Sequence, residues 1–215
     1  NSKYERITTI DAYVPYKEFL VNKYACGTAV LNAPFFLFTL ATTDRTLLGE
    51  DGFQKGCQKS VYYAAIFYLF LGLIFFRLLL KTFDFKSWLI IWLQLLLIFA
   101  TSMIQYVNYE SVFSHVHSFF AITAFLFFSR SYFMKKEMKY FFLSALLLGL
   151  VLILRQVNLL ILLSLPFIAG SWENFRGGVK ELFNKPKLLF IGLFLVFAVC
   201  CIQFMAWYFQ TGSFL

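Results

Sequence analysis

The hydrophobic positions of this chain fall into long runs that are separated by short polar segments. Six runs stand out: Ser60–Leu80, Ser87–Val107, Val112–Ser129, Tyr140–Leu154, Val157–Gly170 and Leu188–Tyr208. Several contain about 20 residues, roughly the length that an α-helix needs to cross a ~30 Å hydrocarbon core. The pattern predicts an all-α fold: a polytopic bundle of about six transmembrane helices, two of them short.

The charges between the runs predict how the chain is threaded. Three polar segments, 77–86, 130–139 and 173–187, hold 11 of the 19 Lys and Arg residues and only four acids. The segment Gln105–Ser114 contains no Lys or Arg, and neither does the tail after Tyr208. By the positive-inside rule, the three basic segments are cytoplasmic, while the other two face outward.

Composition supports a membrane protein. Hydrophobic residues make up 60% of the chain, with 30 Phe, which is more than a soluble domain carries. The net charge is +8, and the three basic segments supply +7 of it (11 cations minus four acids). The cytoplasmic location of the basic segments and their attraction to anionic lipid explain this charge better than a nucleic acid does, so no nucleic-acid partner is expected.

The chain has no initiator Met or signal peptide, and we interpret it as an internal fragment of a longer protein.

Residues 1–59 form a separate polar region that precedes the bundle at 60–215. They carry 13 of the 30 charged residues and one apolar island, Ala29–Leu40, which is too short to cross a membrane and contains Pro34. We expect an extracytoplasmic loop whose island is a helix lying on the outer leaflet, with a true span as the alternative. Cys26 and Cys57 flank the island, and their spacing leaves a disulfide open.

The region Tyr140–Gly170 admits two interpretations. As one helix it would be about 46 Å long, with Arg155 near its middle and the basic segments on opposite sides of the membrane. Two short helices that meet at Arg155 and Gln156 on the outer side satisfy both length and charge. Helices of about 22 Å that end in a polar turn predict a cavity that opens outward.

Polar residues gather before and within the third run. In a helix, two overlapping stripes would form, one of Ser111, Ser114, His115 and Ser118, and one of Glu110, Ser114 and His117. One interpretation is a cavity lining for a phosphate or sugar hydroxyls, with Glu110 as a weak candidate for a catalytic base or metal ligand. The other is a helix start, in which Ser and Glu cap the backbone and His lies at headgroup level.

Two cationic positions complete the candidate site. Arg155, with Asn158 three residues later, is suited to bind a phosphate through two hydrogen bonds. The alternative is an interfacial Arg whose side chain extends to lipid headgroups. Lys23, followed by Tyr24 and by Gly27 as a turn residue, is a second candidate for a phosphate ligand. The alternative is a surface Lys that anchors the apolar island.

Short motifs over nearly the whole chain resemble one family. The segment Asn22–Leu37 (NKYACGTAVLNAPFFL), the turn Asp51–Phe53, the segment Ser114–Phe119 (SHVHSF) and the segment Leu154–Asn158 (LRQVN) are similar to bacterial membrane glycosyltransferases related to dolichyl-phosphate-mannose-protein mannosyltransferases. Gln156 and Val157 depart from the commoner Pro-Thr pair.

The resemblance implies a GT-C fold and transfer of a sugar from a polyprenyl-phosphate donor to a glycan, lipid or protein acceptor. It places the protein in a bacterial inner membrane with its active face periplasmic. The family's catalytic Asp ends the first membrane helix, which would precede Asn1, so this fragment alone is expected to be inactive and its catalytic residue stays unknown. No metal site or cofactor is indicated, although a divalent cation is compatible with the chemistry. A transporter or lipid flippase, and a non-catalytic membrane subunit, are the alternatives.

Overall fold

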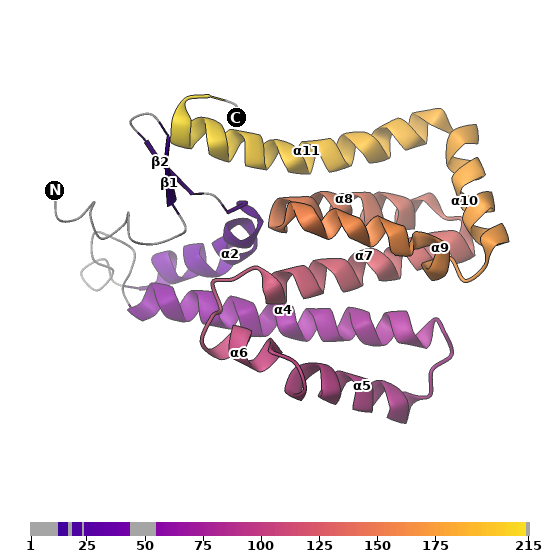
Figure 1. Cartoon of the computed structure of the whole chain (residues 1–215), viewed down its shortest axis with the longest axis horizontal. Helices are drawn as coiled ribbons and strands as arrows, with labels where there is room; N and C mark the ends of the chain where they lie inside the picture. Colours follow the sequence, from indigo (N-terminus) through magenta and orange to yellow (C-terminus); the bar gives the residue numbers. More distant parts are fainter. Residues whose placement is uncertain (1–12, 17–18, 23, 44–54, 214–215) are drawn as a thin grey trace.

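The computed structural model describes residues 13–16, 19–22, 24–43 and 55–213, and these are mostly helical (Figure 1). The elements are β1 (Tyr13–Tyr16), β2 (Phe19–Asn22), α2 (Gly27–Thr42), α4 (Lys55–Lys81), α5 (Ser87–Phe99), α6 (Met103–Asn108), α7 (His115–Lys135), α8 (Met138–Leu154), the 3-10 helix η1 (Gln156–Ser164), α9 (Leu165–Ile168), α10 (Trp172–Asn184) and α11 (Pro186–Thr211). The predicted helical class is confirmed. The sequence did not predict the short hairpin, in which β1 and β2 pair antiparallel.

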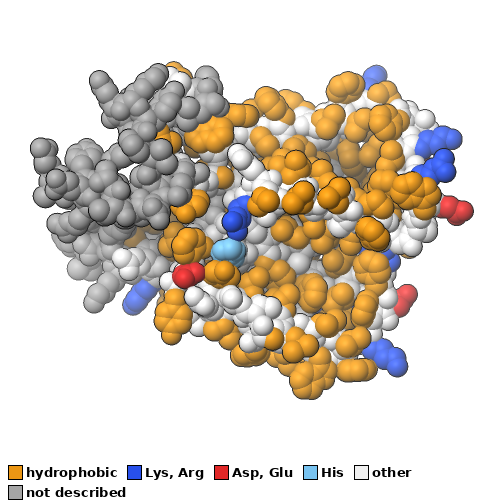
Figure 2. Space-filling view, viewed as in Figure 1, with side chains coloured by type: hydrophobic (Ala, Val, Ile, Leu, Met, Phe, Trp, Pro, Cys, Tyr) orange, Lys and Arg blue, Asp and Glu red, His pale blue; other side chains and the backbone are white. Residues whose placement is uncertain are grey.

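Four long helices form the body of the molecule. Figure 1 shows α4, α7, α8 and α11 side by side, with α7 between α4 and α8 and with α5 and α6 beside α4. We call the end that contains residues 77–86, 130–139 and 173–187 the basic end. The opposite end, formed by α2, residues 109–115 and Arg155, is the polar end. In Figure 2, most of the visible Lys and Arg side chains lie along the basic end.

Among the described residues, two helices are long and apolar enough to cross a membrane, within α4 at Gly56–Lys81 and as α11 at Pro186–Thr211. A third crossing is counted if η1–α9 and α10, which bend by 115° at their junction, are taken as one segment. These helices are compatible with a membrane protein. The total of six crossings remains a prediction.

The run Ser87–Val107 is two helices instead of one. Helix α5 ends at Phe99 and α6 begins at Met103. At the break, the Thr101 hydroxyl donates to the Leu97 carbonyl at 2.5 Å and accepts from the Met103 N–H at 3.4 Å. A side chain that bonds to the backbone in this way competes with the helical ladder, which explains why the helix is interrupted.

The chain reverses at Arg155, as the sequence predicts. Helix α8 ends at Leu154, Arg155 is extended (φ −157°, ψ 122°), and the return begins with a hydrogen bond from the Asn158 N–H to the Arg155 carbonyl. The returning segment is mainly a 3-10 helix, not the α-helix that was expected at 157–170. Because a 3-10 helix rises ~2.0 Å per residue against 1.5 Å in an α-helix, it covers more of the length of the bundle with the same residues.

A buried arginine joins three segments at the basic end. The Arg130 guanidinium donates to the Thr82 carbonyl and hydroxyl (2.7 and 2.6 Å) and to the Ile168 carbonyl (2.8 Å). It also lies 3.5 Å from the centre of the Phe83 ring, which is a cation–π contact. Arg130 therefore connects α7 to the α4–α5 loop and to the end of α9, whereas the sequence suggested only a loop charge.

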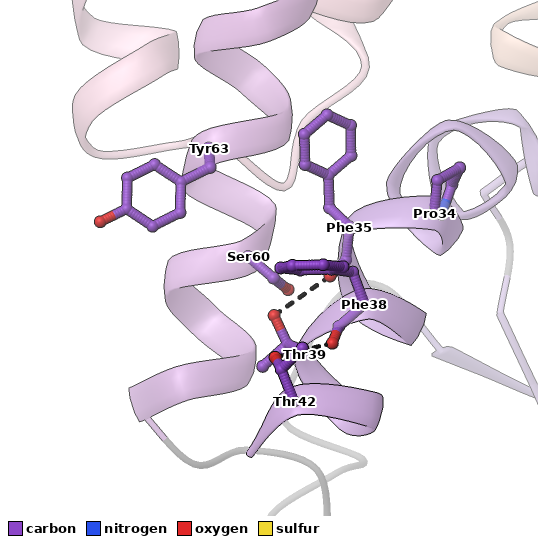
Figure 3. A pocket seen from close by; sticks show the side chains of 7 residues that line it. All are labelled: Pro34, Phe35, Phe38, Thr39, Thr42, Ser60 and Tyr63. Atoms are coloured by element: carbon purple, nitrogen blue, oxygen red, sulfur yellow. Dashed lines mark hydrogen bonds between the residues drawn. The ribbon is translucent and has the colours of Figure 1, made fainter.

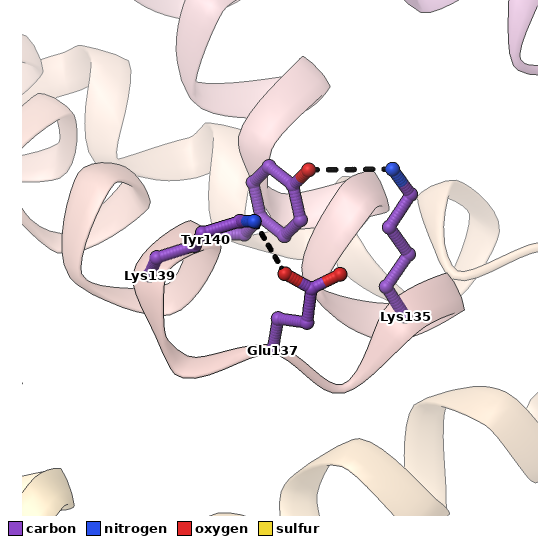
Figure 4. Close-up of polar contacts among 4 residues, drawn as sticks. All are labelled: Lys135, Glu137, Lys139 and Tyr140. Carbon is purple, nitrogen blue, oxygen red and sulfur yellow. Dashed lines mark hydrogen bonds and ion pairs between the residues drawn. The ribbon is translucent and has the colours of Figure 1, made fainter.

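The turn between α7 and α8 carries its own polar contacts (Figure 4). Lys139 pairs with Glu137 at 2.5 Å, and Lys135 donates to the Tyr140 hydroxyl at 3.3 Å. Lys136, between them, adopts a left-handed conformation (φ 56°) that ends α7. The charged groups of this turn therefore lie where α7 ends and α8 begins, at the basic end.

Candidate functional site

The centre of the polar end is a cluster of three ionisable side chains from separate segments. Arg155 follows α8, His115 is the first residue of α7, and Glu110 lies in the loop before α7. Arg155 Nη1 lies 3.5 Å from His115 Nδ1, and the charges of both Arg155 and Glu110 act on the His115 ring. On the face shown in Figure 2, a basic, a histidine and an acidic side chain lie next to one another. The structure thus brings together three residues that the sequence proposed separately.

Neighbouring residues hold this cluster in place. The ring of Tyr106 stacks on His115, with centroids 4.0 Å apart and planes 22° apart. Gln105 Nε2 donates to Glu110 Oε1 at 3.4 Å, and the Glu110 N–H donates to the Gln105 carbonyl at 3.3 Å. Helix α6 therefore orients both His115 and Glu110, a role that the sequence did not predict for Gln105 or Tyr106.

Arg155 is exposed, and among the described residues no carboxylate lies within ion-pair distance of it. One of its nitrogens faces His115, which can accept a hydrogen bond on Nδ1 only when that nitrogen carries no proton. A guanidinium has five N–H donors. The remaining donors of Arg155 are thus available for an anionic ligand, and the arrangement suits a phosphate or carboxylate.

The predicted helical stripes before α7 are interrupted. Helix α7 begins at His115, so Ser111 and Ser114 lie in the preceding turn, and Ser114 precedes the helix without making a side-chain capping bond. Ser118 is buried and accepts a hydrogen bond from Asn158 Nδ2 at 3.1 Å. Asn158 therefore ties the start of η1 to α7 instead of lining an open cavity.

His117 has a different location from the cavity lining that the sequence suggested. It is fully buried, and its Nε2 lies 3.0 Å from Asn32 Oδ1 in α2. Its ring packs 5.3 Å from the ring of Tyr68, whose hydroxyl donates to the Leu31 carbonyl at 3.1 Å. The contacts of His117 and Tyr68 fix α2 against α4 and α7.

Helix α2 confirms that the apolar island is helical. Its first residue, Gly27, lies so close to the end of α8 that an added Cβ would be 2.5 Å from the Ile153 carbonyl oxygen. The sequence interpretation of Gly27 as a turn residue is wrong, because Gly27 is helical and does not have a positive φ. Its function is to allow two backbones to approach closely.

The segment before α2 is held by α11. The Cys26 N–H donates to Gln203 Oε1 at 2.6 Å, and the Asn22 N–H donates to Gln210 Oε1 at 3.3 Å. Tyr24, between them, is exposed and donates its N–H to Asn22 Oδ1 at 2.9 Å. Lys23 and the Asp51–Phe53 turn lie outside the described residues, so their proposed roles stay predictions.

Two polar residues in apolar helices hold α2 and the segment before it in place: Asn32, which contacts His117, and Gln203, which accepts from the Cys26 N–H. The sequence did not predict these roles. The available signal was an amide within an apolar run, which has to find a partner inside the bundle. All four cysteines are free thiols, so Cys26 and Cys57 are not joined. Within the described ranges, no group of three or more His, Cys, Asp or Glu residues is placed to hold a metal ion.

Comparisons of the chain with protein-family models, with curated proteins and with solved structures gave no match. The fold itself defines the class: the part of the chain that the structure describes is a helical bundle in which two or three helices are long and apolar enough to cross a membrane. The candidate site is the Arg155–His115–Glu110 cluster at its polar end.

Proposed function

We propose that this chain belongs to a membrane glycosyltransferase of the GT-C type, which transfers a sugar from a polyprenyl-phosphate donor to a glycan, lipid or protein acceptor. Transfer would take place at the polar end, on the outer face of a bacterial inner membrane. The observation that carries the proposal is the exposed Arg155 guanidinium, which has no carboxylate partner among the described residues and lies beside His115.

The donor phosphate is the first ligand that this arrangement suits. A guanidinium matches the oxygens of a phosphate with two parallel hydrogen bonds. Arg155 follows the end of α8 that faces α2, so its charge would lie on the side of the bundle where we propose that the donor binds. A lipid-linked phosphate satisfies both the charge and the location.

Helix α2 supplies a route for the lipid chain. Its first turn packs against the backbone of Ile153 and Leu154, and its second half, with α4, lines a groove of about 470 Å³ (Figure 3). The groove is formed by Pro34, Phe35, Phe38, Thr39, Thr42, Ser60 and Tyr63. The hydroxyls of Thr39 and Thr42 donate to carbonyls of their own helix, so the groove presents mainly carbon to a ligand. Such a surface suits an isoprenoid tail.

The sugar and the acceptor would lie over the loop before α7. Glu110 and Gln105 would provide acceptors and donors for sugar hydroxyls, and Tyr106, which stacks on His115, would provide aromatic surface nearby. Glu110 is the described carboxylate of this cluster and remains the weak candidate for the base that activates an acceptor hydroxyl. The resemblance implies a stronger candidate, an Asp in a helix that would precede Asn1.

Sidedness is a prediction that labelling can test. We expect single cysteines at Asn108 and Gln156 to react with a membrane-impermeant maleimide in intact cells, because both positions are exposed at the polar end. Single cysteines at Lys135 and Lys180, exposed at the basic end, are expected to react only after permeabilisation. The native cysteines are replaced by alanine for this measurement. Labelling of all four positions from the same side would contradict the proposed threading.

Arg155→Lys should lower sugar transfer by the full-length protein by about ten- to hundredfold. Lysine keeps the charge but lacks the planar guanidinium that donates two parallel hydrogen bonds to a phosphate. One charge-assisted hydrogen bond contributes about 1.5–3 kcal/mol. Membranes that contain the variant are assayed with a polyprenyl-phosphate sugar, by kcat/KM for the donor and by binding of the donor. Arg155→Ala should lower transfer further.

Arg77→Lys is the matched control, because Arg77 is an exposed arginine at the basic end and should leave transfer unchanged. Equal donor affinity and turnover in native protein and Arg155→Lys would exclude the phosphate role. Binding of the donor with movement of the intact lipid across the membrane, but no sugar transfer, would instead identify a flippase.

A further inference from the structure

Helix α10 lies across the basic end of the bundle instead of along it. The axes of η1–α9 and α10 bend by 115° at their junction, and in Figure 1 α10 connects α9 to the start of α11 across the end of the long helices. Ser171 begins the helix by accepting a hydrogen bond from the Asn174 N–H at 3.1 Å. If α4 and α11 cross a membrane, the axis of α10 lies near the plane of its surface.

The inner face of α10 is fixed against the turn after α7. Tyr132 donates its hydroxyl to the Gly178 carbonyl at 2.8 Å, and Lys136 Nζ donates to the Asn174 carbonyl at 2.7 Å. An added Cβ on Gly178 would be 2.6 Å from the Phe133 ring, so the helix packs closely there. These contacts set the rotation of α10 about its axis and thereby determine which residues face away from the bundle.

The outer face combines large apolar side chains with cations. Trp172 and Phe183 are 60% and 70% exposed, and they lie on the same side because the 11 positions between them amount to slightly more than three helical turns. Arg176 and Lys180 are also exposed and project from the adjacent part of that face. A helix with aromatic residues beside cations is the type that lies at a membrane surface.

Not every cation at this end is available to an external partner. Lys139 and Lys185 are paired with Glu137 and Glu181. Burial lowers the pKa of Lys136, the proximity of Glu181 opposes this shift, and the ammonium group is bonded to the Asn174 carbonyl. By contrast, the α10 residues Arg176 and Lys180, and Lys187 at the start of α11, are exposed and make no ion pair with any described residue.

We propose that α10 is an interfacial anchor that binds the anionic phospholipid headgroups of the leaflet at the basic end. Trp172 and Phe183 would enter the boundary between headgroups and acyl chains, while Arg176, Lys180 and Lys187 contact lipid phosphates. Charge complementarity identifies the partner, since 11 cations and four acids lie in the three segments of this end. The proposal requires membrane insertion but is independent of sugar transfer.

The test measures how close Trp172 is to anionic lipid. Full-length protein in which every tryptophan except Trp172 is replaced by phenylalanine (in this chain Trp88, Trp92 and Trp207) is reconstituted in phosphatidylcholine vesicles with and without phosphatidylglycerol. A trace of lipid with a headgroup-linked nitroxide, on either phosphatidylcholine or phosphatidylglycerol, quenches the remaining fluorescence. We expect quenching by the labelled phosphatidylglycerol to exceed quenching by the labelled phosphatidylcholine by about fivefold, which corresponds to about 1 kcal/mol, the contribution of one cation near an anionic surface.

Replacing Arg176, Lys180 and Lys187 by glutamine should reduce this ratio to about one while Trp172 remains quenched by both lipids. The matched control replaces Arg77, Lys81 and Lys86 by glutamine, which removes the same charge from the same end and should preserve the ratio. Helicity by circular dichroism verifies that each variant is folded.

Equal quenching by both lipids in the unsubstituted background would leave only apolar anchoring and overturn the proposal. Absence of quenching would place α10 away from lipid, as for a protein partner, and would also overturn it. Equal loss in both triple variants would show that α10 is not the site.

Discussion

Arg130→Ala should lower the free energy of unfolding of the bundle by about 2–4 kcal/mol. Arg130 is only 6% exposed and donates to the Thr82 and Ile168 carbonyls and to the Thr82 hydroxyl. Each buried acceptor that loses its donor costs about 1–3 kcal/mol. The substitution also removes the cation from the face of Phe83. It further removes the hydrogen bonds that join α7 to the α4–α5 loop and to the end of α9.

The measurement is the midpoint of thermal unfolding in detergent, compared with Arg77→Ala. Arg77 is exposed, so its replacement should change the midpoint little. Arg130→Lys should be intermediate, because an ammonium group cannot reproduce the planar geometry that reaches both Thr82 and Ile168. If Arg130→Ala and Arg77→Ala unfold at the same temperature, the buried network does not stabilise the bundle.

Gly27→Ala should destabilise the protein by about 1–3 kcal/mol, even though alanine favours helices more than glycine. An added Cβ would lie 2.5 Å from the Ile153 carbonyl oxygen and 2.7 Å from the Leu154 nitrogen. Both atoms belong to the backbone, so they cannot move aside by changing a rotamer. Helix α2 has to shift away from α8, and this shift weakens the hydrogen bond between Asn32 and His117.

Gly56→Ala provides the control. Among the described residues, its Cβ would meet only the Thr39 methyl group, at 3.8 Å, which is ordinary contact, and the substitution should be neutral or stabilising. Thermal unfolding reports stability, and the reaction rate of Cys26 with a maleimide reports local displacement, provided that the other three cysteines are replaced. A Gly27→Ala protein with the stability and the Cys26 reactivity of the native protein would show that α2 tolerates the displacement.

These two substitutions separate stability from the proposed chemistry. Arg130 stabilises the basic end, where no sugar-transfer group is proposed. Gly27 packs against the backbone of Ile153 and Leu154, directly before Arg155, so its substitution should weaken donor binding as well as folding. Arg155→Lys changes an exposed side chain and should affect donor binding with little change in the thermal midpoint.

The sequence by itself determined the helical class, the boundaries of most long helices, the gathering of cations at one end and the reversal at Arg155. These features are local or additive. A run of apolar residues favours a helix whatever it packs against, and the charge of a segment does not depend on its neighbours. The helix at Ala29–Leu40 followed from length and composition in the same way, and it extends only a few residues further in the structure, to Gly27–Thr42.

Only the tertiary structure decided which polar residues meet. His117 and Asn32 are 85 positions apart, as the hydrogen bond between them records, and Arg130 reaches Thr82 across 48. Hydropathy and spacing describe one segment at a time, so they assigned His117 to a cavity and Arg130 to a loop. The 3-10 winding of η1 and the inner face of α10 depend likewise on contacts with α7 and α8. A buried polar group has to be satisfied by whichever element lies opposite, and that partner is set by packing, not by the local sequence.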